Sequence, residues 1–252
     1  MILAWVGALF IGLSLGLLGS GGSILTVPIL MYLVGQEPKL AIASSLLIVG
    51  IISFSSAISY AQSKLIQWKT VVIFGVPGMF GAVIGAWGAN FVSDTAQMLV
   101  FSALLLTASY LMFKPLNLQG QHQQRAVYKI ALDGLVVGAI TGLVGVGGGF
   151  LIIPALVLMG GLSMRLAVGT SLIIITIKSF AGFVGYLSVL ESLSLAIDWQ
   201  VIFVFSLIGV VGGWLGGKLS LKINQHKLMK IFGSFLILMG AFILYKNLAV
   251  FI

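Results

Sequence analysis

Two glycine-rich stretches, GLLGSGGSILTVP at residues 16–28 and GLVGVGGGFLIIP at residues 142–154, decide the fold of this chain. Each lies inside a long apolar run and holds three glycines within four positions. Because a glycine costs a helix about 1 kcal/mol relative to alanine, a continuous helix is not expected to pass through either stretch. We therefore predict a helix break at each stretch, with a new helical segment after it.

The composition around these stretches places the chain in a lipid bilayer. Of its 252 residues, 60% are hydrophobic and 7% are charged, and the mean hydropathy is +1.21. A soluble domain carries roughly 25% charged residues, so this chain has too little polar surface for water. Its apolar runs are continuous, which predicts membrane-spanning helices and excludes the alternating strands of a barrel. We therefore predict an all-α polytopic membrane protein.

The two halves of the chain form an internal repeat. Residues 11–61 match residues 137–187 at an offset of 126, and a five-residue insertion then shifts the offset to 131. Matched Gly, Pro, Trp and Tyr residues at fixed offsets distinguish this duplication from chance matches of leucine and isoleucine. We predict a first membrane repeat at 1–113, a polar cytoplasmic linker at 114–127 and a second membrane repeat at 128–252.

The basic residues predict how the two repeats are oriented. If the chain crossed the membrane through each glycine stretch, the basic residues of the loops would divide six against six between the two faces. If the chain reverses direction at each stretch, they divide ten against two, the bias expected between cytoplasmic and outer loops. We therefore predict two inverted repeats of about five helical segments each, with both termini outside. The ten residues predicted on the cytoplasmic face are Lys64, Lys69, Lys114, Arg125, Lys129, Arg165, Lys218, Lys222, Lys227 and Lys230.

The segments that follow the breaks are too short to span a membrane alone. As helices, residues 23–35 and 150–160 would be about 20 Å and about 17 Å long, against a bilayer core of roughly 30 Å. Half-helices in inverted repeats commonly form the substrate site of secondary transporters, and their N-terminal N–H groups and dipoles suit an anion. The substrate-binding residues predicted at the breaks are Gly19, Ser20, Gly21, Gly22, Ser23, Gly145, Gly147, Gly148 and Gly149.

Close helix packing is the alternative explanation for clustered glycines. Small residues four positions apart let two membrane helices approach each other with their backbones in contact. We predict this packing role for the glycine pairs at GxxxG spacing. These pairs are Gly12/Gly16, Gly81/Gly85, Gly138/Gly142 and Gly212/Gly216.

Four polar residues of the later segments complete the predicted site. Lys178 lies twelve residues into the apolar segment 166–188, and a charge so deep in a membrane is a functional-site hypothesis. A contact with the carbonyl groups of a helix end is the alternative for this lysine. Ser45 in the first repeat, and Thr170 and Ser171 in the second, lie soon after the half-helices. Their hydroxyl groups can coordinate a substrate or bond their own helix backbone.

The sequence holds no motif of a metal centre or of a catalytic site. It lacks cysteine, HExxH, GxSxG and any pair of neighbouring carboxylates, so we expect no enzyme activity, no metal and no cofactor. The net charge of +8 comes mostly from basic loops beside apolar segments, so no nucleic-acid partner is expected. The expected partners are a small anionic substrate and the lipid bilayer, and the oligomeric state stays open.

The paired glycine turns, each followed by a proline, resemble those of the TauE/SafE family of sulfite exporters. The resemblance covers essentially the whole chain, and it is closer in the second turn because the first has Ser20 and Ser23. It implies transport of a small anion, such as sulfite, an organosulfonate or a related organic anion, across the cytoplasmic membrane, commonly outward.

The sequence therefore favours a secondary transporter that exports a small anion by alternating access. Asp133 is the only acidic residue near a span interior, and it lies close to the predicted cytoplasmic end. No deep carboxylate is available to carry a coupled proton, whereas an anion leaving a negative-inside cell moves down the potential. An anion-selective channel, and a membrane accessory subunit that binds a lipid or cofactor, stay open as alternatives.

Overall fold

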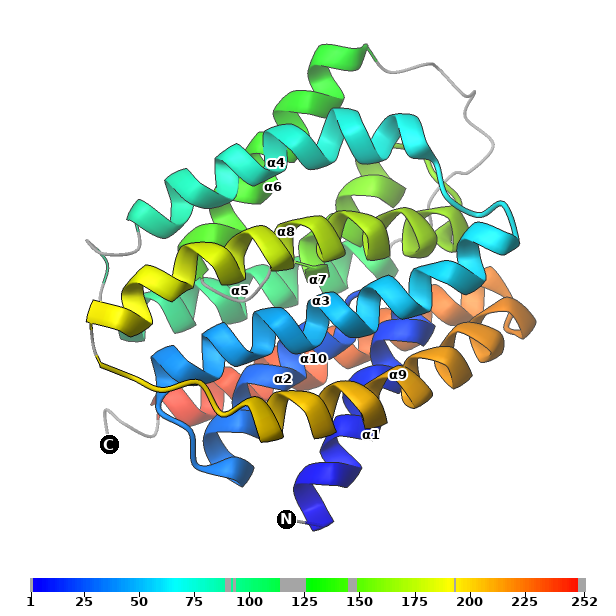
Figure 1. Cartoon of the computed structure of the whole chain (residues 1–252). Helices are drawn as coiled ribbons and strands as arrows, with labels where there is room; N and C mark the ends of the chain where they lie inside the picture. Colours follow the sequence, from blue (N-terminus) through cyan, green and yellow to red (C-terminus); the bar gives the residue numbers. More distant parts are fainter. Residues whose placement is uncertain are drawn as a thin grey trace.

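The structure is a computed structural model that describes residues 2–88, 92, 94–113, 126–144, 149–192 and 194–248. Within these ranges, every regular element is a helix (Figure 1). The elements η1 and η3 are short π-helical continuations of α2 and α7. In chain order the elements are α1 (Ile2–Leu18), α2 (Gly21–Ile29), η1 (Leu30–Val34), α3 (Pro38–Gln62), α4 (Trp68–Gly88), α5 (Asp94–Phe113), α6 (Val127–Val144), α7 (Gly149–Pro154), η3 (Ala155–Met159), α8 (Met164–Ser192), α9 (Trp199–Lys222) and α10 (Gln225–Leu248).

Helix length and composition confirm the prediction of an all-α polytopic membrane protein. Five of the described helices hold apolar windows long enough to cross a bilayer. Two shorter apolar helices, Leu3–Leu18 and Gly21–Val34, lie on either side of the break within the first glycine stretch. The five windows are Lys39–Gln62, Trp68–Gly85, Met164–Leu187, Trp199–Lys222 and His226–Tyr245.

The chain breaks its helix at the first glycine stretch, as predicted. Helix α1 ends at Leu18 and α2 begins at Gly21, and the chain reverses direction between them. A Cβ placed on Gly22 would lie 2.8 Å from Cδ1 of Leu15, and one on Gly7 would lie 3.2 Å from Ile29. The two helices therefore run antiparallel in close contact. At the second stretch α6 ends at Val144 and α7 begins at Gly149, with residues 145–148 outside the described part.

Matched prolines explain the π-helical turns that follow the short helices. Pro28 and Pro154 lie at equivalent positions of the repeat, and a proline supplies no N–H for the ladder of α-helical hydrogen bonds. A π-helical turn follows each proline, and each turn ends near a glycine with positive φ, Gly35 (φ 81°) or Gly161 (φ 66°). The two half-helices therefore share one local design.

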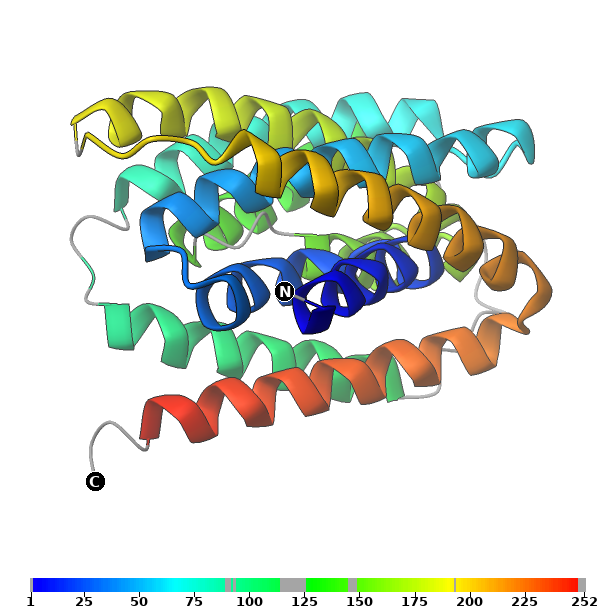
Figure 2. The ribbon, with the colours of Figure 1, turned by 60° about the horizontal axis from the view of Figure 1, so that its bottom comes forward.

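The short helices occupy a middle layer of the molecule. Figure 2 shows α5 and α10 side by side below this layer and α3, α8 and α9 above it. Helix α2 contacts both α3 and α10, while α7 contacts both α8 and α5. Longer helices therefore cover both half-helices on two sides, and this position keeps their irregular ends away from lipid.

Glycines at GxxxG spacing bring two pairs of helices into backbone contact, which confirms their predicted packing role. A Cβ on Gly12 of α1 would lie 2.7 Å from the carbonyl carbon of Gly209 on α9. At the equivalent place, a Cβ on Gly138 of α6 would lie 2.9 Å from the carbonyl carbon of Gly78 on α4. Real Cβ atoms essentially never come this close, so only glycine fits. Both helix pairs run parallel and join one half of the chain to the other.

Helices α3 and α8, which occupy equivalent positions in the repeats, cross each other antiparallel. A Cβ on Gly182 would lie 3.3 Å from Cδ1 of Leu46, and a Cβ on Gly50 would lie 3.4 Å from Cβ of Ser179. Residues later in α3 therefore contact residues earlier in α8, as expected for antiparallel helices. Figure 1 shows this pair crossing the middle of the molecule in opposite directions.

Most of the described basic side chains gather at one end of the helices. Arg165 donates a hydrogen bond of 3.0 Å to the carbonyl oxygen of Ile223, and Gln67 N–H donates one of 3.0 Å to Thr170. These contacts bring the α3–α4, η3–α8 and α9–α10 connections to the same end (Figure 1). Lys39 lies in the first turn of α3, at the opposite end. The basic residues at the first end are Lys64, Lys69, Lys129, Arg165, Lys218, Lys222, Lys227 and Lys230.

We predict that Gly142→Ala destabilises the protein by roughly 1–3 kcal/mol, because the added methyl group overpacks the α4–α6 contact. A Cβ at this position would lie 2.7 Å from the carbonyl carbon of Ala82. The measurement is the apparent Tm of the purified protein in detergent. Gly185→Ala is the matched control, because a Cβ on this α8 glycine meets nothing within 4 Å. Equal Tm values for the two variants would contradict the packing role.

Candidate functional site

The first helix break places a serine without a hydrogen-bond partner in the protein interior. Gly19 has a φ of +73°, which favours glycine, and Ser20 precedes the first residue of α2. Ser20 is 0% exposed, its hydroxyl makes no capping bond, and its Oγ has no partner among the described atoms. A buried hydroxyl without a partner carries a desolvation cost, and a helix start without a side-chain cap is a ready site for an acceptor.

The beginnings of the two half-helices touch each other. A Cβ on Gly149, the first residue of α7, would lie 3.1 Å from Cβ of Ser20 and 3.1 Å from Oγ of Ser23. A Cβ on Gly19 would lie 3.0 Å from Cδ1 of Ile153 on α7. The described atoms therefore bring the breaks of both halves into one buried region.

Helix α8 holds the first break in place through a serine. Ser171 Oγ lies 3.1 Å from the carbonyl oxygen of Gly19 and 2.9 Å from that of Val168, so it can donate to either. A Cβ on Gly19 would lie 2.9 Å from the same Oγ. Ser171 therefore lies at the break, as the sequence predicts, and its hydroxyl bonds the backbone there.

Lys178 places a positive charge in the interior, about two turns of α8 beyond Ser171. Its side chain is 8% exposed, and Nζ donates a 3.2 Å hydrogen bond to Oγ1 of Thr141 on α6. Thr141 in turn donates to the carbonyl oxygen of Gly138 at 3.0 Å. No described carboxylate forms an ion pair with this lysine. A buried cation without a counter-charge is expensive, and an anion beside Nζ would offset that cost.

The positively charged centre exists in one half of the repeat only. The residue equivalent to Lys178 is Ile52, and the residue equivalent to Thr141 is Leu15. Ile52 is fully buried and packs against Gly209 and Gly213 of α9. The two halves thus share a scaffold, while the second half adds the charge.

The remaining predicted site residues have structural contacts. Ser45 donates to the carbonyl oxygen of Ile42 in its own helix at 2.7 Å. Thr170 accepts a bond from the N–H of Gln67, at the basic end of the molecule. Ser23 donates to the carbonyl oxygen of Ser20 at 2.7 Å, so it stabilises the start of α2.

The described glycines of the first break pack against neighbouring helices. A Cβ on Gly21 would lie 3.2 Å from Cε1 of Phe235 on α10, and Gly22 lies against α1. The predicted residues Gly145, Gly147 and Gly148 lie outside the described residues. That the predicted site residues bind a substrate stays a prediction.

Sequence reasoning did not assign three polar residues that lie close to this centre. Thr141 binds Lys178, and Ser53 and Ser179 are fully buried on α3 and α8 with no hydrogen-bond partner for either Oγ. Ser53 and Ser179 are equivalent residues of the repeat, so the alignment of the halves was the available signal. Their missing partners become visible only in three dimensions.

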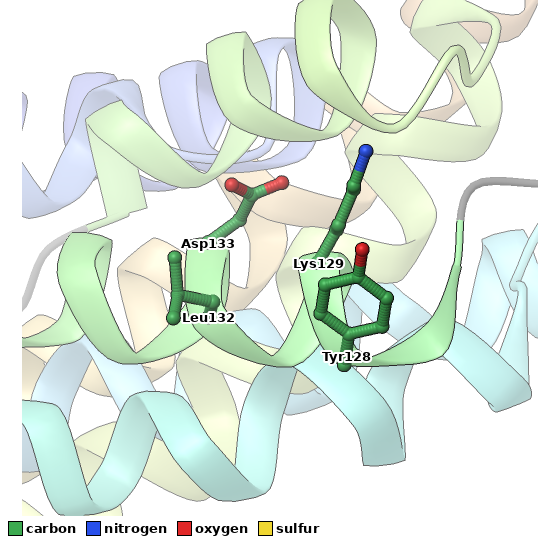
Figure 3. Close-up of a pocket in the computed structure, with 4 residues that line it drawn as sticks. All are labelled: Tyr128, Lys129, Leu132 and Asp133. Carbon is green, nitrogen blue, oxygen red and sulfur yellow. The ribbon is translucent and has the colours of Figure 1, made fainter.

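A surface pocket of about 310 Å³ lies at the beginning of α6, at the basic end of the molecule (Figure 3). Lys129 and Asp133 point the same way from neighbouring turns of α6, and Tyr128 and Leu132 complete the lining. The pocket contains charges of both signs and none of the predicted site residues. In the described part of the chain, no three His, Cys, Asp or Glu side chains are grouped to hold a metal ion.

Comparison with known proteins gives consistent results over nearly the whole chain. The family model described as sulfite exporter TauE/SafE matches residues 4–243. A "probable membrane transporter protein" of Xylella fastidiosa (strain 9a5c) is 31% identical over 95% of this chain and 93% of its own length. The "probable membrane transporter protein YunE" of Bacillus subtilis is 31% identical over 92% of this chain and 93% of its own length.

A more distant relative comes from an archaeon. The "probable membrane transporter protein MJ0441" of Methanocaldococcus jannaschii is 28% identical over 94% of both chains. No solved structure matches this chain. The relatives' names all describe membrane transport.

We predict that Gly19→Ala destabilises the protein more than Gly161→Ala does. Both glycines have positive φ, so alanine costs roughly 1–2 kcal/mol at either position. A Cβ at Gly19 would also lie 2.9 Å from Cγ1 of Val168, whereas one at Gly161 meets nothing within 4 Å. The apparent Tm of both variants in detergent measures the difference. An equal decrease in Tm for Gly161→Ala and Gly19→Ala would show that the break is not closely packed.

Proposed function

The chain belongs to the sulfite exporter TauE/SafE family of membrane transporter proteins, and on this premise we propose that it carries a small anion by alternating access. The proposed substrates are sulfite, an organosulfonate or a related sulfur-containing or organic anion. The chain is a multi-pass membrane protein, and the proposed location is the cytoplasmic membrane.

The observation that carries this proposal is the buried cation at the centre of the molecule. Lys178 is 8% exposed, bonds the neutral hydroxyl of Thr141, and has no carboxylate partner in the described part of the chain. An anion beside Nζ would supply the missing counter-charge. The start of α2, which no side chain caps, adds the positive end of a helix dipole to the same interior.

Exchange of contacts between the halves supports an inverted repeat. Helix α1 packs on α9, and the equivalent pair is α6 on α4, while α3 packs on α8, α5 on α10 and α2 on α7. The equivalent helices α3 and α8 are antiparallel, which is what a twofold axis in the membrane plane requires. In inverted repeats of this kind, one half rocks against the other around a central site. We propose that the two halves here move in this way.

Burial of the centre favours a carrier over a channel. Ser20 and Ser171 are 0% exposed and Lys178 is 8% exposed, so these side chains lie buried in the interior. A carrier passes through an occluded state, and a conducting channel requires a continuous path. Saturable flux with counterflow is therefore expected instead of ohmic current.

The charge distribution supports a direction for transport. The basic end, which holds Lys64, Arg165 and Lys222, would be cytoplasmic by the positive-inside rule. Both termini would then lie outside. A monovalent anion that leaves the cell gains about 2.3 kcal/mol per 100 mV of negative-inside potential, so export needs no coupled ion.

We predict that Lys178→Met lowers saturable efflux of sulfite from proteoliposomes at least tenfold, because the central counter-charge is lost. The assay compares sulfite, sulfate, an alkylsulfonate and a carboxylate, each with and without a potassium diffusion potential. Lys218→Met is the matched control, since Lys218 is exposed and its Nζ lies 3.4 Å from the centre of the Trp214 ring. Wild-type efflux by Lys178→Met would remove Lys178 from the site, and no flux of any tested anion by the wild type would overturn the proposed function.

We predict that single cysteines at Ser63 and Ser194 react with an impermeant maleimide from opposite faces of the membrane. The chain has no cysteine, so the wild type is an unlabelled background. Ser63 lies at the basic end, and Ser194 lies in the α8–α9 connection at the other end (Figure 1). In intact cells Ser194→Cys is expected to react and Ser63→Cys to be protected until the membrane is opened. The reverse pattern would contradict the proposed orientation, and labelling from one face would contradict the fold.

A further inference from the structure

We infer that Ser53 and Ser179 donate hydrogen bonds to the transported oxyanion at the crossing of α3 and α8. This inference rests on the proposed function and deepens it by adding neutral donors to the charge of Lys178. Both serines are 0% exposed, and in the described structure neither Oγ has a hydrogen-bond partner. They are equivalent residues of the two repeats, so the same unsatisfied group occurs once in each half.

Seven buried serines in the described part of the chain have an Oγ without a hydrogen-bond partner, and Ser53 and Ser179 are the one pair among them at equivalent positions of the repeat. Ser45, Ser14 and Thr176 bond carbonyl groups three or four residues earlier in their own helices, at 2.7–2.9 Å. Ser53 and Ser179 could do the same by rotation about χ1, and they do not. A buried hydroxyl left without a partner costs roughly 1–3 kcal/mol, so two equivalent ones indicate groups that await a ligand.

The helix crossing places these two hydroxyls in one region. A Cβ on Gly50 would lie 3.4 Å from Cβ of Ser179, and Ser53 lies one turn further along α3 than Gly50. Because Gly50 has no side chain, α3 approaches α8 closely beside Ser179. Lys178 is the residue next to Ser179 on α8, so the two residues lie at the same level of this helix, and the Lys178 side chain turns toward Thr141 on α6.

Charge decides which kind of ligand suits these hydroxyls. A hydroxyl can donate to an anion or accept from a cation. Of the acidic side chains that the structure describes, Glu37, Glu191 and Asp198 lie at helix ends or in connections, and Asp133 lies on α6 about two turns before Thr141. None of them shares the depth of the crossing, whereas Lys178 does. The local field is therefore positive, and an oxyanion with several acceptor oxygens fits two O–H donors and one ammonium group.

The test measures sulfite transport and sulfite binding for Ser53→Ala, Ser179→Ala and the double variant in the full-length chain. Each lost hydrogen bond to a charged ligand is expected to raise the KM about tenfold. Saturating sulfite is expected to raise the apparent Tm of the wild type by mass action and to raise that of the double variant less or not at all. Ser206→Ala is the matched control, because Ser206 on α9 is also buried with a partnerless Oγ and is expected to keep wild-type KM and Tm shift.

A structural role for these serines predicts a different result. Removal of a hydroxyl that has no partner is expected to leave the Tm without sulfite unchanged or slightly higher. A lower Tm without sulfite, or wild-type KM and Tm shift in both single variants, would overturn the inference while leaving the proposed function intact. If the wild type neither transports nor is stabilised by any tested anion, the proposed function fails and the inference fails with it.

Discussion

Inside a bilayer every backbone N–H and C=O group needs a partner from the protein, and this constraint governs the molecule. The chain leaves helical geometry between Leu18 and Gly21, where the backbone cannot complete its own hydrogen bonds. The surrounding helices therefore have to enclose the break. Ser171 bonds the carbonyl oxygen of Gly19, and Tyr60 donates a 2.9 Å bond to the carbonyl oxygen of Gly16 in the last turn of α1. The helices that enclose the irregular backbone are therefore the same helices that line the predicted central site.

The glycines outside the breaks serve this enclosure. Gly12 on α1 and Gly138 on α6 let each first helix of a repeat contact the fourth helix of the other repeat at backbone distance. Because each contact joins the two halves, neither half is expected to fold into its packed form without the other. The two halves share the same helix arrangement but differ in polar side chains, since Lys178 and Thr141 occupy the positions of Ile52 and Leu15 in the first half. A single charge suits a site that binds one anion between two similar halves.

Much of this arrangement could be predicted from the sequence, because glycine spacing and charge leave few alternatives in a membrane. The helix break at Gly19, the packing role of Gly12 and Gly138, and the helical membrane fold are confirmed. Burial of Lys178 agrees with its predicted depth, while its role in binding stays a prediction. The roles of the serine hydroxyl groups could not be predicted in this way, because a serine in a helix can bond its own backbone or a ligand. Ser45 does the first, and Ser53 has no partner, yet the two look alike in sequence; only the crossing of α3 and α8 distinguishes them.

The most direct test of the account is the position of the bound anion. Selenite has the shape and charge of sulfite, and its selenium atom gives an anomalous signal in crystals of the full-length protein. The account predicts one selenium peak between α3 and α8, with oxygens within hydrogen-bond distance of Lys178 Nζ and of the hydroxyls of Ser53 and Ser179. A peak confined to the surface pocket lined by Lys129, or an occupied centre in which Lys178 bonds Thr141 alone, would contradict it.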